Sequence, residues 1–312
     1  MSQEDRPFIG INWGSSNFRA YLIAHNGSKI DEVSRPCGIL GLTREGMEEQ
    51  IELLNVQWPQ ARQIYASGMI GSNVGWVEAP YIQCPTSIDA LSHQLTRTKM
   101  AGRDVAIVPG LTCDDSSGQP DVLRGEELEL FGLLMRPSSK AGSGHRTILL
   151  PGTHSKWVSM TGNSIEIFFT SMAGELFDRV TEKGILASII DGPAKPGLWF
   201  SRGLGESWSS GRSLASLLFQ ARALVMRKKM EKADAASYLR GLLIGSELAD
   251  AKARLAQFGT AAIEMVGNPL VASLYQAALD EMGLKSIIVS SDSACLAGFA
   301  ALHQASFEAE AQ

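Results

Sequence analysis

The first third of the chain alternates short apolar runs with turn residues. Phe8–Ile11 is apolar, and Phe18–Ala24 alternates apolar and polar positions around Arg19, which is typical of two β-strands. The small, polar residues of Asn12–Asn17 lie between them and predict a tight turn. A further strand is expected at Val105–Val108. This pattern is typical of the start of an α/β domain.

Two helices are expected in the same region. One extends from Arg44 to about Asn55. The other begins near Gly125 and carries Glu126 and Glu127 in its first turn, where the helix dipole favours carboxylates.

The strand, turn, strand pattern begins again in the second half. Apolar runs at Thr147–Leu150 and Trp157–Met160 flank a second polar turn. Apolar positions then recur at helical spacing from about Ser213 to Lys252, which predicts one long helical stretch.

The stretch 137–144, PSSKAGSG, separates the two halves and has the composition of a linker. We therefore predict two α/β domains, 1–136 and 137–312. The last helix, about 293–307, is expected to pack back on the first domain. Because each domain offers a turn rich in backbone donors, we expect a nucleotide in the cleft between them.

Composition narrows the class of function. The 312 residues are 45% hydrophobic and 20% charged, as in an ordinary soluble enzyme, and the net charge is −5. The sequence has no basic patch for nucleic-acid phosphates and no apolar run of the roughly 18 residues that a membrane span needs. Its four cysteines are scattered without metal-ligand spacing. We expect a cytoplasmic protein without a secretory signal, a zinc site, a nucleic-acid partner or a membrane partner.

The first turn is a candidate phosphate site. Gly14, Ser15, Ser16 and Asn17 supply backbone N–H groups and side-chain donors that suit phosphate oxygens. A plain β-turn explains the same short pattern, so both interpretations stay open at this point.

The second turn is the matching candidate. Gly152 allows close backbone approach, and the hydroxyls of Thr153 and Ser155 are expected to donate to phosphoryl oxygens. Lys156 either adds a positive charge or points into solvent. His154 is either structural or catalytic. Gly267, in the turn between a strand and a helix, is a candidate for the adenosine site.

Glu126 and Glu127 are the candidate general bases. A hydroxyl that accepts a phosphoryl group needs a carboxylate to take its proton. Simple capping of the helix is the alternative. Adjacent residues of a helix point about 100° apart, so at most one of the two faces the acceptor.

The chain resembles the 2-dehydro-3-deoxygalactonokinase family over nearly its whole length. The resemblance rests on seven segments in consistent order: INWGSSNFRAYL (11–22), GMIGSNVGWVEAPY (68–81), IVPGL (107–111), DVLRGEELELFG (121–132), LPGTHSKWV (150–158), MAGELF (172–177) and LRGLLIGSEL (239–248). It implies two ribonuclease-H-like, actin-like ATPase domains. The implied reaction is ATP-dependent phosphorylation of 2-dehydro-3-deoxy-D-galactonate to its 6-phosphate, a step of galactonate catabolism. Mg²⁺ is the implied metal cofactor. The first domain would bind the sugar acid and the second the nucleotide.

The resemblance also suggests roles for single residues. Glu126 and Glu127 are similar to the Gly-Glu-Glu segment of exopolyphosphatases, in which a Glu orients the attacking water. Glu175 of MAGELF either binds substrate or packs at the domain interface. A sugar-acid carboxylate requires hydrogen-bond donors, and those expected are Arg19, Gly71, Ser72 and Asn73. Trp76 either stacks on the sugar carbons or belongs to the core.

One position departs from the family pattern. The first phosphate turn of the family usually reads Asp-Trp-Gly, and this chain has Asn12 in place of the Asp. An amide keeps an acceptor oxygen but loses the charge, so Asn12 is expected to contact Mg²⁺ only indirectly, through water, and more weakly.

Two other functions remain open from the sequence. One is a phosphohydrolase similar to exopolyphosphatase, although the second turn lacks the Gly-Gly-Gly-Ser pattern of those enzymes. The other is a non-catalytic nucleotide-binding paralogue, which Asn12 makes conceivable. The stereochemistry of the sugar acid and the oligomeric state stay open as well.

Overall fold

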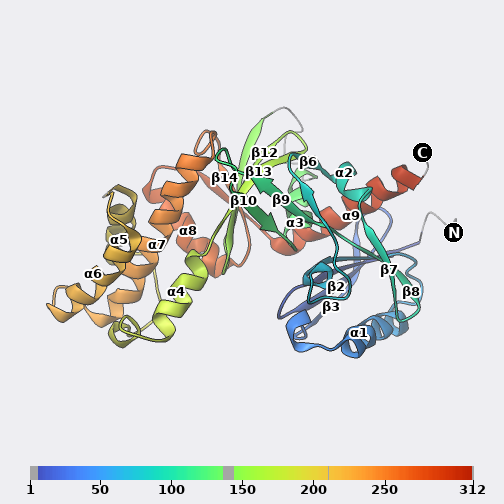
Figure 1. Cartoon of the computed structure of the whole chain (residues 1–312), viewed down its shortest axis with the longest axis horizontal. Helices are drawn as coiled ribbons and strands as arrows, with labels where there is room; N and C mark the ends of the chain where they lie inside the picture. Colours follow the sequence, from blue (N-terminus) through green and yellow to red (C-terminus); the bar gives the residue numbers. More distant parts are fainter. Residues whose placement is uncertain (1–5, 136–143, 210, 311–312) are drawn as a thin grey trace. The chain divides into compact units, whose positions relative to one another are not determined.

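The structure is a computed structural model that describes residues 6–135, 144–209 and 211–310. The chain divides into two compact units (Figure 1). Unit 1 extends to residue 143 and also includes Thr161–Ile167 and the chain from Ser291 onward. Unit 2 consists of Gly144–Met160 and Phe168–Ser290. The predicted boundary at 136 and the predicted linker, apart from Gly144, lie outside the described residues.

Unit 1 is built on a mixed six-stranded sheet in the order β3-β2-β1-β4-β8-β7. The first three strands form an antiparallel meander, β4 and β8 run parallel to β1, and β7 is antiparallel to β8. The strands are β1 (Phe8–Trp13), β2 (Phe18–Ile23), β3 (Lys29–Arg35), β4 (Ile64–Gly68), β7 (Thr96–Met100) and β8 (Arg103–Ile107). The predicted opening of strand, turn, strand is confirmed.

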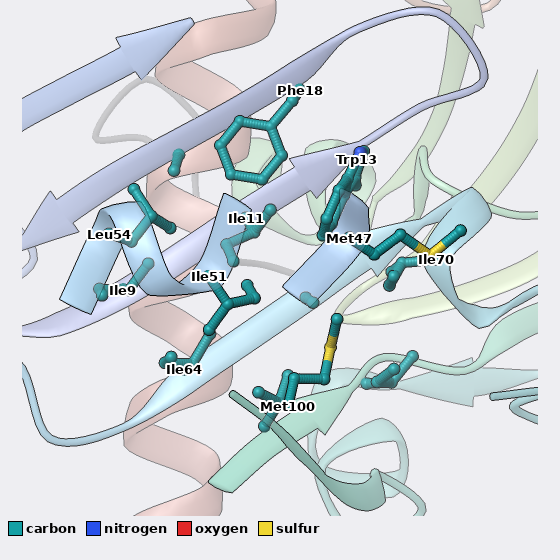
Figure 2. Close-up of a cluster of buried hydrophobic side chains, with 14 of the residues drawn as sticks. Ile9, Ile11, Trp13, Phe18, Met47, Ile51, Leu54, Ile64, Ile70 and Met100 are labelled. Carbon is teal, nitrogen blue, oxygen red and sulfur yellow. The ribbon is translucent and has the colours of Figure 1, made fainter. Parts of the chain in front are cut away.

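The core of unit 1 lies between this sheet and α1 (Arg44–Gln57). Thr43 caps α1 by accepting a hydrogen bond from the N–H of Gly46. Met47, Ile51 and Leu54 recur at helical spacing and pack with strand residues such as Ile11 (Figure 2). The helix predicted from Arg44 is confirmed.

Smaller elements complete unit 1. A three-stranded sheet has the order β10-β9-β5. The remaining elements of the unit are η2 (Ile39–Gly41), η3 (Met69–Gly71), β5 (Tyr81–Gln83), β6 (Thr86–Ser87), α2 (Ile88–Ser92), β9 (Gly110–Asp114), β10 (Pro120–Leu123), α3 (Glu127–Leu134) and α9 (Ser291–Glu310).

Helices α3 and α9 cross at glycines. A Cβ on Gly132 would overlap the carbonyl oxygen of Ala294, and one on Gly298 would overlap that of Leu128. Only glycine permits this approach of the two backbones. The crossing places the first turns of the two helices side by side, where Ser291 contacts Glu129.

Unit 2 contains the second sheet, in the order β15-β14-β11-β12-β13. The strand β14 runs parallel to both β11 and β15. The tip of the β12–β13 hairpin belongs to unit 1, where it pairs with β6. The strands are β11 (His145–Leu150), β12 (Ser155–Thr161), β13 (Ser164–Ser171), β14 (Ile263–Val266) and β15 (Ser286–Val289).

The helices of unit 2 differ from the predicted pattern at one place. The prediction of one helical stretch over 213–252 is wrong, because the structure has two helices there, α6 (Leu214–Met226) and α7 (Lys232–Arg254). Lys228 has a φ of 55°, and the N–H of Lys229 bonds to the carbonyl of Leu224. The other helical elements are α4 (Ala173–Glu182), η4 (Ala187–Ile189), α5 (Leu198–Ser209) and α8 (Pro269–Glu281). No helix in the described ranges is both long and apolar enough for a membrane span.

Candidate functional site

The turn between β1 and β2 is closed by a backbone hydrogen bond and is open to solvent. The N–H of Gly14 donates to the carbonyl of Asn17 at 2.9 Å, and Ser15, Ser16 and Asn17 are exposed. The loop after β3 packs directly on this turn, because a Cβ on Gly38 would overlap backbone atoms of Ser15 and Ser16. The predicted donors of the first turn are therefore accessible.

The strand β4 ends beside the end of β1, where this turn begins. Because β1 and β4 are parallel, Trp13 pairs with Gly68, whose φ of 102° turns the chain sharply. A Cβ on Gly68 would lie 2.5 Å from the carbonyl oxygen of Trp13. The segment 69–75, which includes the predicted substrate residues Gly71, Ser72 and Asn73, begins at this point.

The predicted substrate residues of this segment have different environments. Asn73 is exposed, whereas the Ser72 hydroxyl donates to the carbonyl of Met69 at 2.7 Å. Gly71 is buried, and a Cβ there would lie 2.8 Å from Nη1 of Arg124. Arg124 also bonds to the carbonyl of Ala79 at 2.7 Å, so it supports this segment from below.

Trp76 is covered rather than open. Its ring packs against the core of unit 1, and the guanidinium carbon of Arg44 lies 3.9 Å from the ring centroid. The indole N–H donates to the hydroxyl of Thr98 at 3.3 Å. A sugar that stacked on the Arg44 face would have to displace Arg44.

The two candidate bases at the start of α3 have different environments. Glu127 is fully buried and accepts hydrogen bonds from the Ser67 hydroxyl at 2.7 Å and the Gly125 N–H at 2.6 Å. Burial raises the pKa of Glu127 to about 7, against the hydrogen bonds that lower it. Desolvation therefore outweighs these hydrogen bonds in setting the pKa of Glu127.

Glu126 occupies the N-cap position and is half-buried. Its side chain makes no capping hydrogen bond to the first turn in the described part of the chain. A capping hydrogen bond therefore does not account for Glu126, and the favourable effect of the helix dipole on a first-turn carboxylate stays the alternative explanation. Gly125, with a φ of 110°, sets the angle at which the chain enters the helix.

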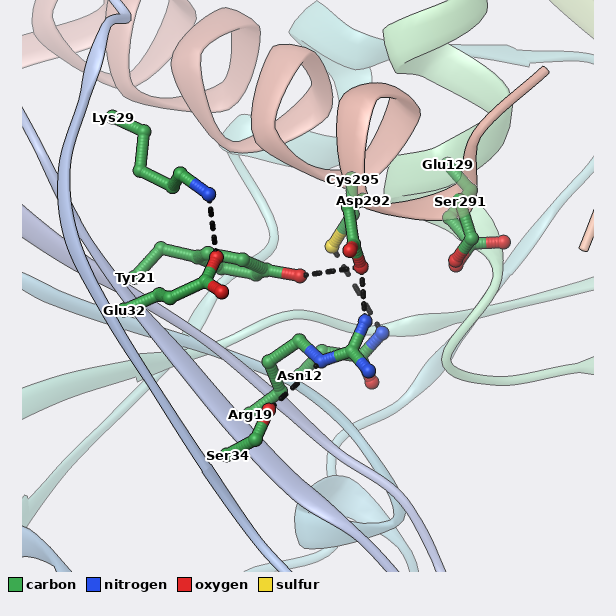
Figure 3. Close-up of polar contacts among 10 residues, drawn as sticks. All are labelled: Asn12, Arg19, Tyr21, Lys29, Glu32, Ser34, Glu129, Ser291, Asp292 and Cys295. Atoms are coloured by element: carbon green, nitrogen blue, oxygen red, sulfur yellow. Dashed lines mark hydrogen bonds and ion pairs between the residues drawn. The ribbon is translucent and has the colours of Figure 1, made fainter. Parts of the chain in front are cut away.

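A polar cluster joins α3 and α9 to the strands β1 and β2 (Figure 3). Glu129 is almost fully buried and accepts a hydrogen bond from the Ser291 hydroxyl at 2.5 Å. Burial raises the pKa of Glu129 to about 8. Asp292 forms an ion pair with Arg19 and accepts from the Tyr21 hydroxyl at 3.2 Å. Glu129 and Asp292 were not predicted from the sequence, where the local signal is only a polar start of the last helix.

Asn12 lies at the edge of this cluster. Its amide nitrogen is 3.9 Å from the sulfur of Cys295, on the first turns of α9. No group of three or more His, Cys, Asp or Glu side chains in the described residues is arranged to chelate a metal ion by itself. The amide of Asn12 and the carboxylate of Asp292 are oxygen donors of the kind that fits the water shell of Mg²⁺.

A hollow adjoins the first turn and contains Arg19. Its volume is about 250 Å³, and it is lined by Asn17, Phe18, Arg19, Ser34, Arg35 and Pro36. Two guanidinium groups on one small hollow favour an anionic ligand. Arg19 is partly engaged, since it also donates to the Ser34 hydroxyl at 3.2 Å.

The turn between β11 and β12 exposes Thr153 and His154 in unit 2. The N-terminus of α4 packs on this turn: the N–H of Glu175 donates to the carbonyl of Thr153 at 2.9 Å. The Glu175 carboxylate lies 2.6 Å from Nε2 of His154, and this bond lowers the pKa of Glu175. The segment MAGELF therefore supports the second turn, and His154 has a structural partner.

Two predicted donors of the second turn are buried. The Ser155 hydroxyl is fully buried and lies 3.0 Å from the hydroxyl of Tyr275. The ammonium group of Lys156 donates to the Thr170 hydroxyl at 2.6 Å, on β13. The side chain of Lys156 is buried and does not point into solvent, because its position on β12 places it over the neighbouring strand β13.

Gly267 follows β14, the parallel neighbour of β11, so the two turns meet at one edge of the sheet. A Cβ on Gly267, which has a φ of 158°, would lie 3.1 Å from the carbonyl oxygen of Pro151. Asn268 caps α8 by accepting from the N–H of Leu270. Gly152, Thr153 and Gly267 are therefore brought together within unit 2.

Known proteins match this chain over nearly its full length. The model of the family described as 2-keto-3-deoxy-galactonokinase matches residues 12–302. The chain belongs to this family. A probable 2-dehydro-3-deoxygalactonokinase of Rhizobium meliloti (strain 1021) is 32% identical over 96% of this chain and 97% of its own length. The 2-dehydro-3-deoxygalactonokinase of Escherichia coli (strain K12) is 29% identical over 96% of this chain and 98% of its own.

A solved structure agrees with these matches. The crystal structure of a Sinorhizobium meliloti protein described as a 2-dehydro-3-deoxygalactonokinase is similar to this chain, with a TM-score of 0.86 and 31% sequence identity. The match covers 96% of this chain and 98% of that one. The resemblance seen in seven sequence segments is thus confirmed. The α/β class with two ribonuclease-H-like units is confirmed with it.

Proposed function

We propose that the protein transfers the γ-phosphoryl group of ATP to the 6-hydroxyl of 2-dehydro-3-deoxy-D-galactonate. The observation that supports this most directly is the full-length match to a family named for this activity. Each unit has an exposed turn rich in backbone N–H donors, which is the kind of turn that binds the phosphates of a nucleoside triphosphate. We expect ATP and the sugar acid to be its partners, in the cytoplasm, with no nucleic acid or membrane involved.

In this proposal the nucleotide binds along the edge of the unit 2 sheet. Gly267 lies under the adenosine, while the backbone of Gly152 and the hydroxyl of Thr153 donate to phosphoryl oxygens. Ser15, Ser16 and Asn17 of the first turn are proposed to donate to phosphoryl oxygens as well. Ser155 and Lys156, whose polar atoms are bonded inside the protein, position the second turn rather than touch the phosphates.

The sugar acid is proposed to bind at unit 1. Its carboxylate would pair with Arg19 at the hollow beside the first turn, with Arg35 as the second positive charge. The exposed Asn73 and the backbone around Ser72 supply further donors for hydroxyl groups. Mg²⁺ would neutralise charge on the phosphates, and Asn12 and Asp292 are the residues proposed to hold its water shell.

Glu126 is the proposed catalytic base. Its carboxylate takes the proton of the 6-hydroxyl as that oxygen bonds to the γ-phosphorus and the bond to the β-phosphate oxygen breaks, releasing ADP. Glu127 is already bonded to Ser67 and Gly125, so it is proposed to hold the start of α3 in place.

A coupled assay of ADP release tests the function. It compares 2-dehydro-3-deoxygalactonate, 2-dehydro-3-deoxygluconate and no acceptor, each with ATP and Mg²⁺. The proposal expects turnover that is fastest with the galactonate. Equal ADP release without acceptor would indicate a phosphohydrolase. Nucleotide binding without turnover under any condition would indicate a non-catalytic paralogue.

A further inference from the structure

Unit 2 contains a chain of buried polar groups behind its phosphate turn. Glu247, on α7, is 3% exposed and accepts hydrogen bonds from the indole N–H of Trp157 at 2.7 Å and the hydroxyl of Tyr275 at 2.9 Å. The Tyr275 hydroxyl lies 3.0 Å from that of Ser155. Ser155 is the residue at which the turn ends and β12 begins.

The direction of these hydrogen bonds follows from counting protons. A carboxylate only accepts, so the one hydroxyl proton of Tyr275 goes to Glu247. The Tyr275 oxygen then accepts from the Ser155 hydroxyl at 3.0 Å, which is the shorter of the two bonds open to that hydroxyl, since the carbonyl of Gly152 lies 3.5 Å away. This leaves the Ser155 oxygen as an acceptor for the N–H of Gly152, which lies 3.4 Å away. The chain therefore leads from a buried carboxylate to the backbone of the turn.

The carboxylate is costly to bury, so its partners matter. Burial raises the pKa of Glu247 above its ordinary value, and hydrogen bonds from Trp157 and Tyr275, together with weaker ones from Ser171 and Ser155, act against that shift. The Tyr275 hydroxyl, fully buried beside Glu247, has its pKa raised as well, so it stays protonated as the donor. Arg240, two helical turns before Glu247 on α7, contributes an opposite charge close to both groups.

We propose that Glu247 is a positioning residue for nucleotide binding, acting through Tyr275 and Ser155 on the second phosphate turn. The proposal rests on the proposed function, because it assigns ATP phosphates to Gly152 and Thr153. It also gives a role to the segment 239–248, which carried the family resemblance but no chemistry in the sequence. Glu247 touches no substrate; it acts by holding the donor geometry of the turn.

Two variants that each break one link test the proposal. Tyr275→Phe removes the bridging hydroxyl, and Ser155→Ala removes its partner on the turn. Each is expected to raise the KM for ATP and the Kd for ADP, measured by calorimetry, about five- to tenfold, the cost of one lost buried hydrogen bond. The KM for the sugar acid should stay unchanged. The double variant should be no worse than the more affected single variant, since both act through one chain.

The matched control is Tyr238→Phe. Tyr238 is also a fully buried tyrosine of unit 2 whose hydroxyl donates to a glutamate, Glu206, at 2.5 Å. Its hydroxyl has no part in the chain that leads to the phosphate turn. It is expected to lower thermal stability to a similar extent without a selective change in the KM for ATP.

The outcomes separate the proposals. A rise in the KM for ATP that is equal in Tyr275→Phe and Tyr238→Phe overturns the positioning role, and so does an unchanged KM for ATP in Tyr275→Phe. If Tyr275→Phe does not fold, Ser155→Ala decides by the same criteria. If the unaltered chain binds ADP but phosphorylates no sugar acid, the proposed function fails, and the calorimetric comparison still tests the role of Glu247.

Discussion

The replacement Gly174→Ala probes how closely α4 must approach the second phosphate turn. A Cβ at this position would overlap the carbonyl oxygen of Gly152 and lie 2.8 Å from both Cα and the carbonyl oxygen of Thr153. All of these are backbone atoms, so no side chain can move aside. Reaching an ordinary separation of 3.4 Å from the Gly152 oxygen requires the turn or the helix to shift by about 1.2 Å.

The expected effect is larger on catalysis than on stability. Overpacking of this kind costs about 1–3 kcal/mol of folding free energy. Alanine recovers about 0.5–1 kcal/mol of that through its better helix propensity. A displacement of a phosphate-binding turn by about 1 Å is expected to lower kcat/KM for ATP by about 10²-fold. The sugar acid, proposed to bind at unit 1, should keep its KM.

The assay combines steady-state kinetics with thermal denaturation, and Gly205→Ala is the matched control. Gly205 lies within α5 of the same unit, and a Cβ there meets no atom within 4 Å. Gly205→Ala should therefore stabilise the protein slightly and leave kcat/KM unchanged. Unaltered kcat/KM for ATP in Gly174→Ala would refute the reasoning, because the turn would then tolerate the displacement.

Three further predictions follow from unit 1. Glu126→Gln should lower kcat by about 10²–10⁴ with ATP affinity spared, measured beside Glu127→Gln; equal mild losses in both would show that neither is the base. Asn12→Asp should tighten the dependence of activity on Mg²⁺ with little change in the KM for the sugar acid; lower activity at every Mg²⁺ concentration would contradict this. Glu129 is predicted to make stability depend on pH. Its raised pKa of about 8, against an ordinary value of 4.5, means that the folded state binds the extra proton between these values. Stability should therefore fall as pH rises through this window, by a few kcal/mol on the order of magnitude, and Glu129→Gln should flatten the thermal denaturation profile there. An identical slope in both proteins would contradict the prediction.

Local pattern alone was enough for the secondary structure around both turns. Alternation and turn residues placed β1, β2, β11 and β12, because strand and turn preferences act between near neighbours in the chain. The exposure of Ser15, Ser16 and Asn17 also agrees with their small, polar character. The same reasoning failed at Lys228, since the composition of 213–252 does not reveal a left-handed residue.

The environment of the charged residues depended on tertiary structure. Ser67 and Glu127 are 60 positions apart, and Arg19 and Asp292 are 273 apart, so no periodicity connects them. Desolvation is the largest influence on the pKa of Glu127, because the surrounding elements exclude water from its carboxylate.

Ser155 shows most clearly which features followed from the sequence and which from the tertiary structure. Its sequence neighbours mark it as part of a phosphate-sized turn, and the sequence therefore determined where donors would gather. Only the packing of α7 and α8 against the sheet placed Glu247 and Tyr275 behind its hydroxyl. Short-range preferences select the shape of a turn, whereas the partners of a buried polar group depend on which distant elements cover it.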